Sequence, residues 1–433
     1  MGKCGEKMLR YKLPNKSKKF DFVFNMFGSG MLSLLSVILL MTVSRTSGDK
    51  LAGIFTLCYS TAQMLNCIAT FSLRDIQVTD AEHRFSFRDM TMFRTLSIVL
   101  MLVSSVLFLL IKGFSGIKLT LALLLCVFMA LIAVSDIFQG NMHYNGYLSL
   151  GGASLGFQCV LSAIVFAVTL IIFKSLIVSV CAMMVVLLLW ILFFDLPFAK
   201  NLGEIKPKFN FAKQKELLLL TLPIFISTFL NQYNLNTPKY AINDFLTDID
   251  QSRYGYLIMP AFVINLLSAF VFRPQLVPLS NDWKNKKYVS FLKTVTKLFT
   301  WILAVTVVCL IGGYFLGIPV LNIIYSTDLS GYEYKFLILL AGGAASACSS
   351  LTIVLLAVIR KQKFALIAYS LAFAIAQFAP PLLVKNYGFL GAVLSYLTVT
   401  VSLFLFLITV FIICFLKNRK TPEDIADAKR QTK

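Results

Sequence analysis

The sequence predicts an all-α integral membrane protein with about twelve transmembrane helices, a fold class that three observations support. Hydrophobic residues make up 58% of the 433 positions, and the mean hydropathy is +0.80. Only 14% of the residues are charged, whereas an ordinary soluble protein has about 25%. Apolar stretches of about 20 residues, the length that crosses a hydrocarbon core as a helix, recur along the whole chain.

The predicted helices follow one another with short polar connections. In chain order the spans are 22–43, 51–73, 92–111, 118–138, 149–173, 175–194, 217–238, 256–279, 296–318, 336–359, 364–384 and 388–416. The longest interruption with turn-forming residues, 195–216, holds two prolines and five lysines. It divides the helices into two sets of six. Because an even number of helices gives both halves the same orientation, we expect pseudo-symmetric bundles with a site between them.

The expected organisation has five parts. A basic arm at 1–21 precedes a six-helix bundle at 22–194, a linker at 195–216, a second six-helix bundle at 217–416 and a tail at 417–433. A weak similarity between the second and eighth spans indicates an internal duplication. Each of these two spans contains an Asn (Asn66, Asn265), and an Arg (Arg74, Arg273) lies near its inner end.

The connecting segments alternate between basic and nearly uncharged, which sets the orientation. With the N-terminus in the cytoplasm, 31 of the 40 Lys and Arg fall on the inner side. The positive-inside rule therefore predicts cytoplasmic termini and a cytoplasmic linker. The net charge of +20 is spread over these short segments. It is better explained by topology and by contacts with anionic headgroups than by nucleic-acid binding.

Polar side chains inside spans are costly and therefore mark a candidate pathway. In the first bundle Asn25 begins a stripe of serines in the first span, and Gln63 lies beside Asn66 in the second. Small polar residues also join helices by close packing and hydrogen bonds, so the Ser and Thr positions have a purely structural alternative.

The seventh span is the most polar. Asn231, Gln232, Asn234 and Asn236 crowd into six residues, more amides than helix packing requires, and they predict contact with water or a polar ligand. Pro238 frees a backbone carbonyl and allows a bend, which is tolerable where the backbone lines a cavity. The next residue, Lys239, either extends to the outer interface or faces the cavity and meets an anion.

Two arginines end spans at corresponding places in the two halves. Arg74 and Arg273 are either topology anchors or a pair of guanidinium groups at the inner mouth, suited to bidentate phosphate contact. No Asp or Glu falls in the middle of a predicted span, since Asp136 and Asp195 fall at inner ends. The sequence therefore offers no buried carboxylate of the kind that proton- or sodium-coupled antiporters use.

The sequence contains no motif that predicts metal, cofactor or nucleotide binding. The nine cysteines include no CxxC pair, and His83 and His143 have no ligand-like neighbours. The GxxxxGK[ST] signature of nucleotide-binding proteins is absent, so we expect no cofactor and no ATP hydrolysis.

The residues from Leu222-Pro223 through Asn236-Thr-Pro-Lys-Tyr-Ala-Ile242, followed by Tyr254-Gly255-Tyr256, resemble the helix-seven signature of a known family. That family is the polysaccharide-exporter branch of the multidrug/oligosaccharidyl-lipid/polysaccharide (MOP) exporter superfamily. Its pattern has a Pro near the start of helix seven, a basic residue near its end and a Gly-aromatic pair after the loop. The resemblance covers nearly the whole chain in layout but only these positions in motif.

The resemblance implies a MATE-like fold and a flippase of the bacterial inner membrane. Such a flippase moves undecaprenyl-pyrophosphate-linked oligosaccharide outward for O-antigen or capsule assembly, beside membrane lipids and polymerase machinery. Carried over by position, Lys239 matches the basic residue of the motif. We add Asn231, Asn234, Asn236, Arg273, Arg74, Asn25, Gln63 and Asn66 as candidate substrate-binding residues from their polarity alone.

Three alternatives remain. A MATE-like multidrug exporter coupled to protons or sodium shares the fold, but the lack of a mid-span acid counts against it. A polytopic glycosyltransferase or polymerase would need large external loops, and the longest predicted here, 239–255, is short. A membrane scaffold that transports nothing is the third.

Overall fold

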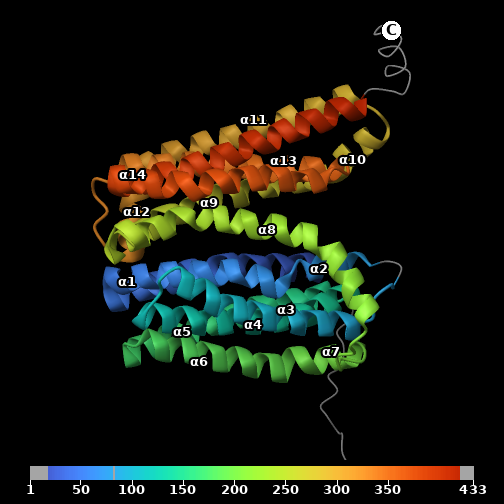
Figure 1. Ribbon diagram of the computed structural model, residues 1–433, viewed down its shortest axis with the longest axis horizontal. Coiled ribbons are helices and arrows are strands. Elements are labelled where there is room, and N and C mark those ends of the chain that lie inside the picture. Colours follow the sequence, from blue (N-terminus) through green and yellow to red (C-terminus); the bar gives the residue numbers. More distant parts are fainter. Residues whose placement is uncertain (1–17, 81–82, 420–433) are drawn as a thin grey trace, which may run out of the picture. The chain divides into compact units, whose positions relative to one another are not determined.

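A computed structural model describes residues 18–80 and 83–419, and every regular element within them is a helix (Figure 1). The chain divides into two compact units, Met1–Phe229 and Leu230–Lys433. Most of the predicted basic arm and tail lies outside the described residues.

The first unit contains most of the N-terminal half of the chain. Its elements are α1 (Lys18–Thr70), α2 (Leu73–Thr79), α3 (Phe87–Ile111), α4 (Gly116–Tyr144), α5 (Leu148–Phe173), α6 (Leu176–Trp190), the π-helical turn η1 (Ile191–Asp195) and α7 (Leu196–Leu202). Helix α8 (Phe211–Phe245) begins in this unit and ends in the next, because the division falls after Phe229.

The second unit contains the end of α8 and the remaining helices. They are α9 (Asp248–Phe272), η2 (Arg273–Gln275), α10 (Leu276–Lys284), α11 (Tyr288–Gly312), η3 (Gly313–Gly317), α12 (Ile318–Tyr325), α13 (Glu333–Val358), η4 (Gln362–Phe364) and α14 (Ala365–Arg419). Helix α13 packs against α9, α11 and α14 and so forms the centre of this unit.

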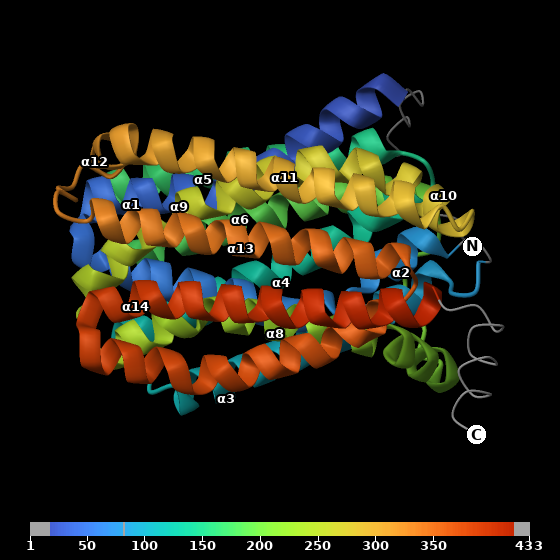
Figure 2. The same ribbon diagram turned by 90° about the horizontal axis from the view of Figure 1, so that it is seen from above.

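Two glycines divide the longest helices. Gly48 in α1 has φ 79° and Gly388 in α14 has φ 56°, backbone conformations that are left-handed and that favour glycine. Each break separates two helices that run in different directions, as the ends of α1 and α14 in Figure 2 show. The 53-residue α1 and the 55-residue α14 therefore supply two spans each, at the predicted positions.

The prediction of about twelve spans is confirmed for the described residues. Nine helices there are long and apolar enough to cross a membrane, and α1 and α14 are two of them. Counting α1 and α14 as two spans each, and adding α9, gives twelve. The chain is therefore built as a polytopic membrane protein.

Several predicted boundaries differ. The eighth span was expected to run to residue 279, but α9 ends at Phe272 and a 3₁₀ turn leads into the short α10. The outer connection expected at 239–255 is mostly helical, because α8 runs to Phe245 and α9 begins at Asp248. The sixth helix does not end at Asp195. It continues from α6 through η1, which ends at Asp195, into α7, whose first turn accommodates Pro197.

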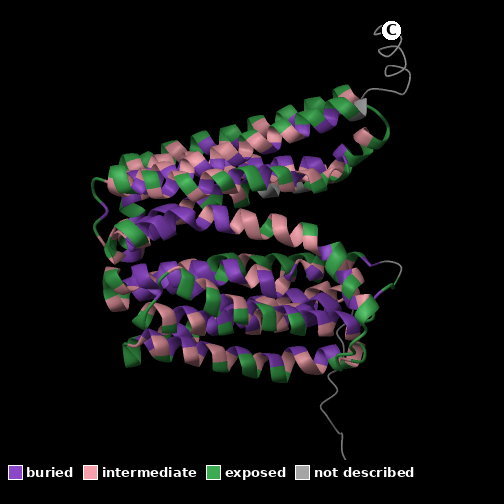
Figure 3. Ribbon diagram, in the orientation of Figure 1, coloured by how far each residue is buried: buried purple, intermediate pink, exposed green. Residues whose placement is uncertain are grey.

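Helix packing within each unit relies on close backbone approach. A Cβ atom added to Gly152 in α5 would lie 2.6 Å from the carbonyl oxygen of Phe24 in α1. One added to Gly343 in α13 would lie 2.6 Å from the carbonyl oxygen of Ala261 in α9. Small residues at helix crossings are the usual means of packing in a bilayer. Buried and exposed positions alternate along the helices (Figure 3). The exposed residues include many large apolar side chains, which are suited to contact with lipid.

Candidate functional site

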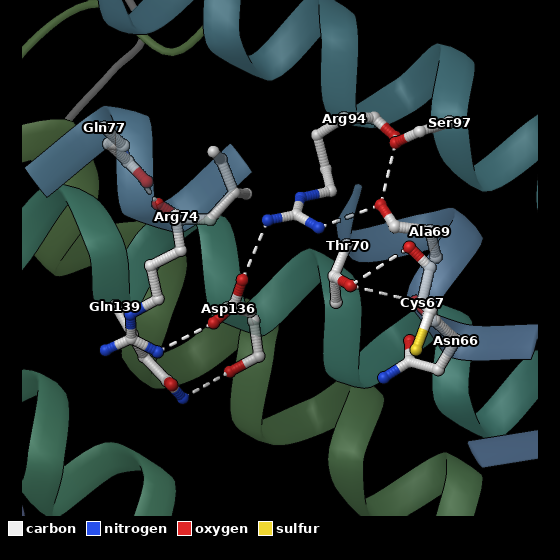
Figure 4. A network of polar contacts seen from close by, with 12 residues as sticks. Asn66, Cys67, Ala69, Thr70, Arg74, Gln77, Arg94, Ser97, Asp136 and Gln139 are labelled. Atoms are coloured by element: carbon white, nitrogen blue, oxygen red, sulfur yellow. Dashed lines mark hydrogen bonds and ion pairs between the residues drawn. The ribbon is translucent and has the colours of Figure 1, made fainter. Parts of the chain in front are cut away.

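An ion-pair network joins three helices of the first unit (Figure 4). Asp136 on α4 accepts a hydrogen bond from Arg74 on α2 at 2.7 Å through one carboxylate oxygen. Its other oxygen accepts one from Arg94 on α3 at 2.8 Å. Asp136 lies more than two turns before α4 ends at Tyr144, so this carboxylate is well inside its helix.

Arg94 is the deeply buried member of the network, with 1% of its surface exposed. Its second guanidinium nitrogen donates to the backbone oxygen of Ala69 at 2.8 Å, and Ser97 donates to the same oxygen at 2.7 Å. Ala69 stands at the end of α1, where carbonyls have no partner within the helix. The network therefore also caps α1.

The electrostatics of the network extend to Asp75, which follows Arg74 on α2. Partial burial and the negative charge of Asp136 raise the pKa of Asp75, and the neighbouring Arg74 opposes this shift. Because two arginines share one carboxylate here, Arg74, Arg94 and Asp136 together carry one net positive charge. Arg74, whose side chain is 31% exposed, is the most exposed member of the network.

A second carboxylate of the first unit, Asp195, is completely buried at the end of η1. Ser135 on α4 and Ser154 on α5 each lie 2.5 Å from one of its oxygens. Among the described residues no cation forms an ion pair with it. Asp195 is therefore a buried carboxylate inside the candidate span Leu176–Leu202, and the expectation that the chain has no buried carboxylate is wrong at this position.

In the second unit, Lys239 is 7% exposed on α8. Within the described part of the chain its amine has neither a hydrogen bond nor an ion pair. Gln232, Asn236 and Lys239 are spaced four and three residues apart, so they lie along one face of the helix. The amide nitrogen of Asn236 donates to the backbone oxygen of Gln232 at 2.9 Å along this face.

The other predicted amides of α8 have different surroundings. Asn234 is fully buried, and its amide nitrogen approaches the backbone oxygen of Tyr369 on α14 at 3.5 Å. Its side-chain oxygen is buried without a partner. Asn231 is half-buried. The tyrosine between these positions, Tyr233, packs against Phe373 of α14 with ring centroids 5.3 Å apart.

The remaining predicted site residues differ in how far they are exposed. Asn25 and Gln63 are exposed, whereas Asn66 is half-buried with its side-chain oxygen lacking a partner. Arg273 begins η2, and its side chain lies outside the described part of the structure. Their assignment to a binding site stays a prediction.

Sequence reasoning missed Arg94, Ser135 and Ser154. Arg94 falls two residues inside the predicted third span and was read as part of the basic inner side. An arginine inside a span is itself a signal that a carboxylate lies nearby, because the charge must be paired there. Ser135 and Ser154 carry no comparable signal, since single serines are common in transmembrane helices.

The described residues thus form two compact helical units with buried charged groups and polar helix faces. No family model matches the chain. The chain is 23% identical over 403 residues to the capsular polysaccharide biosynthesis protein CapF of Staphylococcus aureus. The aligned region covers 91% of this chain and 98% of CapF.

Solved structures identify the fold more closely. An inward-facing MATE multidrug transporter of the MOP superfamily superposes with a TM-score of 0.69 at 10% identity, over 93% of this chain and 98% of that one. The lipid II flippase MurJ gives a TM-score of 0.65 at 16% identity, over 91% of this chain and 90% of MurJ. A point mutant of the Vibrio cholerae MATE transporter VcmN gives a TM-score of 0.62 at 14% identity, over 92% of this chain and 97% of that one. The chain has the fold of the MOP superfamily transporters, as the sequence resemblance implied.

Proposed function

We propose that the chain is a flippase of the bacterial cytoplasmic membrane for surface polysaccharide assembly. It moves an undecaprenyl-pyrophosphate-linked oligosaccharide from the inner to the outer leaflet by alternating access of its two helix bundles. The name of the CapF relative, which refers to capsular polysaccharide biosynthesis, supports this pathway, and the likeness to MurJ supports the lipid-linked substrate class.

The observation that carries the proposal is Lys239. A buried ammonium group without a counter-ion is costly, and a bound phosphate would offset that cost. The amides of Gln232 and Asn236 on the same helix face provide donors and acceptors for phosphate oxygens or sugar hydroxyls. A lipid-linked sugar pyrophosphate needs such groups, because its charges and hydroxyls lose their water on crossing.

The energy for export is available from the membrane potential. Moving about two negative charges outward across an inside-negative membrane releases roughly 4.6 kcal/mol per 100 mV, twice the value for one charge. Cations that travel with the headgroup lower this figure.

A multidrug exporter is the second candidate, because the MATE transporter has the same fold. The argument that a coupling carboxylate is missing no longer applies, since Asp136 and Asp195 both lie within helices. The flippase and the multidrug exporter differ instead in the charge of their substrates, and a site with a buried cation binds an anion. Lys239 favours an anionic headgroup and disfavours the cationic compounds that a site with an unpaired carboxylate would attract.

The test compares a deletion strain with complemented strains. Deletion should cause lipid-linked repeat units to accumulate in the inner leaflet and surface polymer to be lost. Complementation with Lys239→Gln should fail to restore export, whereas Lys174→Gln, which changes an exposed lysine, should restore it. Normal surface polymer in the deletion strain, together with greater drug sensitivity, would contradict the proposal and support the exporter.

A further inference from the structure

The buried carboxyl group of Asp195 is the centre of a polar cluster that the proposed function does not use. The cluster joins three helices of the first unit at the π-helical turn η1, a type of irregularity that is frequent at functional sites. Its members are Ser135 and Gln139 on α4, Ser154 and Gln158 on α5, Trp190 on α6 and Asp195 itself. All except Trp190 are buried.

The hydrogen bonds at Ser135 can be counted. Its hydroxyl oxygen lies 2.5 Å from a carboxyl oxygen of Asp195 and 2.8 Å from the side-chain oxygen of Gln158. It also accepts a hydrogen bond from the amide nitrogen of Gln139 at 2.8 Å. A hydroxyl group has one proton, so Ser135 cannot donate to both Asp195 and Gln158. With Asp195 ionised, one of these two contacts has no proton.

A proton on Asp195 supplies the donor that is missing from the hydrogen bonds around Ser135. The carboxyl O–H then donates to Ser135, and Ser135 donates to Gln158. The other carboxyl oxygen accepts from Ser154 at 2.5 Å, and Ser154 in turn accepts from the indole nitrogen of Trp190 at 3.1 Å. Every contact of the cluster then has one donor and one acceptor.

The surroundings of Asp195 agree with a neutral acid. The charged and titratable groups on the helices packed against it are Lys118, Cys126, Asp136, His143 and Tyr144 on α4, Cys159 on α5, Cys181 on α6 and Lys200 on α7. Within the described residues none of these groups pairs with Asp195. Asp136 faces Arg74 and Arg94 instead, and Lys200 is exposed.

We propose that Asp195 is a proton-binding site: its carboxyl group carries a proton in this structure, and the packing of α4, α5 and η1 around it depends on pH. Loss of that proton leaves a negative charge among three helices, and no cation within residues 18–80 and 83–419 pairs with it. An unpaired buried charge of this kind loosens the contact between the helices. The site lies wholly within the first unit and stands apart from the flippase proposal.

Infrared spectroscopy of the purified full-length protein tests the proton directly. A protonated carboxyl group has a carbonyl band that is separate from those of carboxylates and amides. The wild-type protein should show such a band, which shifts in heavy water and is absent from Asp195→Asn. Asp328→Asn, which alters an exposed acid in a loop, should keep it. A wild-type spectrum at acidic and neutral pH that lacks any band removed by Asp195→Asn would overturn the proposal. In that case Asp195 is ionised and the amide of Gln158 is turned to donate to Ser135.

Unfolding midpoints across pH provide the second measurement. The folded chain holds this proton more tightly than the unfolded chain, so stability is present at low pH and falls as pH rises. Asparagine has the shape and donor of the neutral acid, so Asp195→Asn should match the wild type at low pH and exceed it at high pH. Parallel pH profiles for the two proteins would contradict the proposal.

A further variant keeps the test decisive if Asp195→Asn does not fold. Ser135→Ala removes the acceptor of the Asp195 proton, so it should move the carbonyl band that wild type shows. An unmoved band would assign it to another carboxyl group and overturn the proposal. Neither readout requires export, so the flippase function can fail or succeed independently.

Discussion

Replacing Asp136 with Asn should strongly destabilise the chain, because it removes the carboxylate shared by Arg74 and Arg94 while keeping the side-chain shape. Arg94 is 1% exposed, so its guanidinium group would remain buried without a counter-ion. Breaking a buried pair in this way costs about 3–5 kcal/mol. Arg74, with a side chain that is 31% exposed, can turn to water. We therefore expect Arg74→Gln to cost only about 1 kcal/mol.

Equilibrium unfolding of the purified protein in lipid nanodiscs, followed by the fluorescence of its three tryptophans, measures both changes. The double variant Asp136→Leu with Arg94→Met replaces the pair by apolar side chains. It should recover most of the loss, since removing both members of a buried ion pair is often neutral. Equal destabilisation by Asp136→Asn and Arg74→Gln, or a double variant as unstable as Asp136→Asn, would refute this reasoning.

Three further predictions concern topology, the cation of α8 and helix packing. A cysteine replacing Lys208 and one replacing Asp244 should react with an impermeant thiol reagent from opposite sides of the membrane; labelling from one side would contradict the twelve-span topology. Lys239→Gln should weaken substrate binding about ten- to over a hundredfold, because a charge-assisted contact contributes about 1.5–3 kcal/mol. Lys239→Arg should retain export, and equal export by both variants would remove Lys239 from the site. Gly391→Ala should lower the unfolding midpoint, because its Cβ would lie 2.0 Å from the backbone oxygen of Leu383, whereas Gly30→Ala meets nothing within 4 Å. Equal midpoints would show that the backbone near Leu383 can shift.

The helices themselves could be predicted from the sequence, because hydrophobic length is a local property. The breaks at Gly48 and Gly388 separate spans that could already be divided from the sequence, because charged residues lie between the apolar stretches there. The ends of α9 and the start of α7 could not be predicted in the same way. At Asp195 the sequence shows an acid followed by a proline, the usual end of a helix, but a π-helical turn lets the helix continue.

The candidate site was only partly predictable, since partners come from distant positions. Lys239 was identified as a candidate by its match to the basic residue of the helix-seven motif. It is buried in the structure, and its role in binding stays a prediction. Arg74 was identified too, but its bond to Asp136 spans 62 residues and leaves no trace in local pattern. For the same reason Asp195 was taken for an end residue, although it is buried by serines from two other helices.

The pairing of Arg94 with Asp136 also has a consequence for biosynthesis. Helix α3 leaves the ribosome before α4, so Arg94 reaches the membrane before its carboxylate partner has been made. An unpaired arginine opposes insertion by about 2.5–3.5 kcal/mol at the centre of a span. Arg94 lies near the start of α3, so its cost is below that value. We expect the insertion machinery to retain α3 until α4 emerges and to release the two helices into lipid as a hairpin. On this expectation, the order of synthesis makes α3 and α4 a single unit of membrane integration.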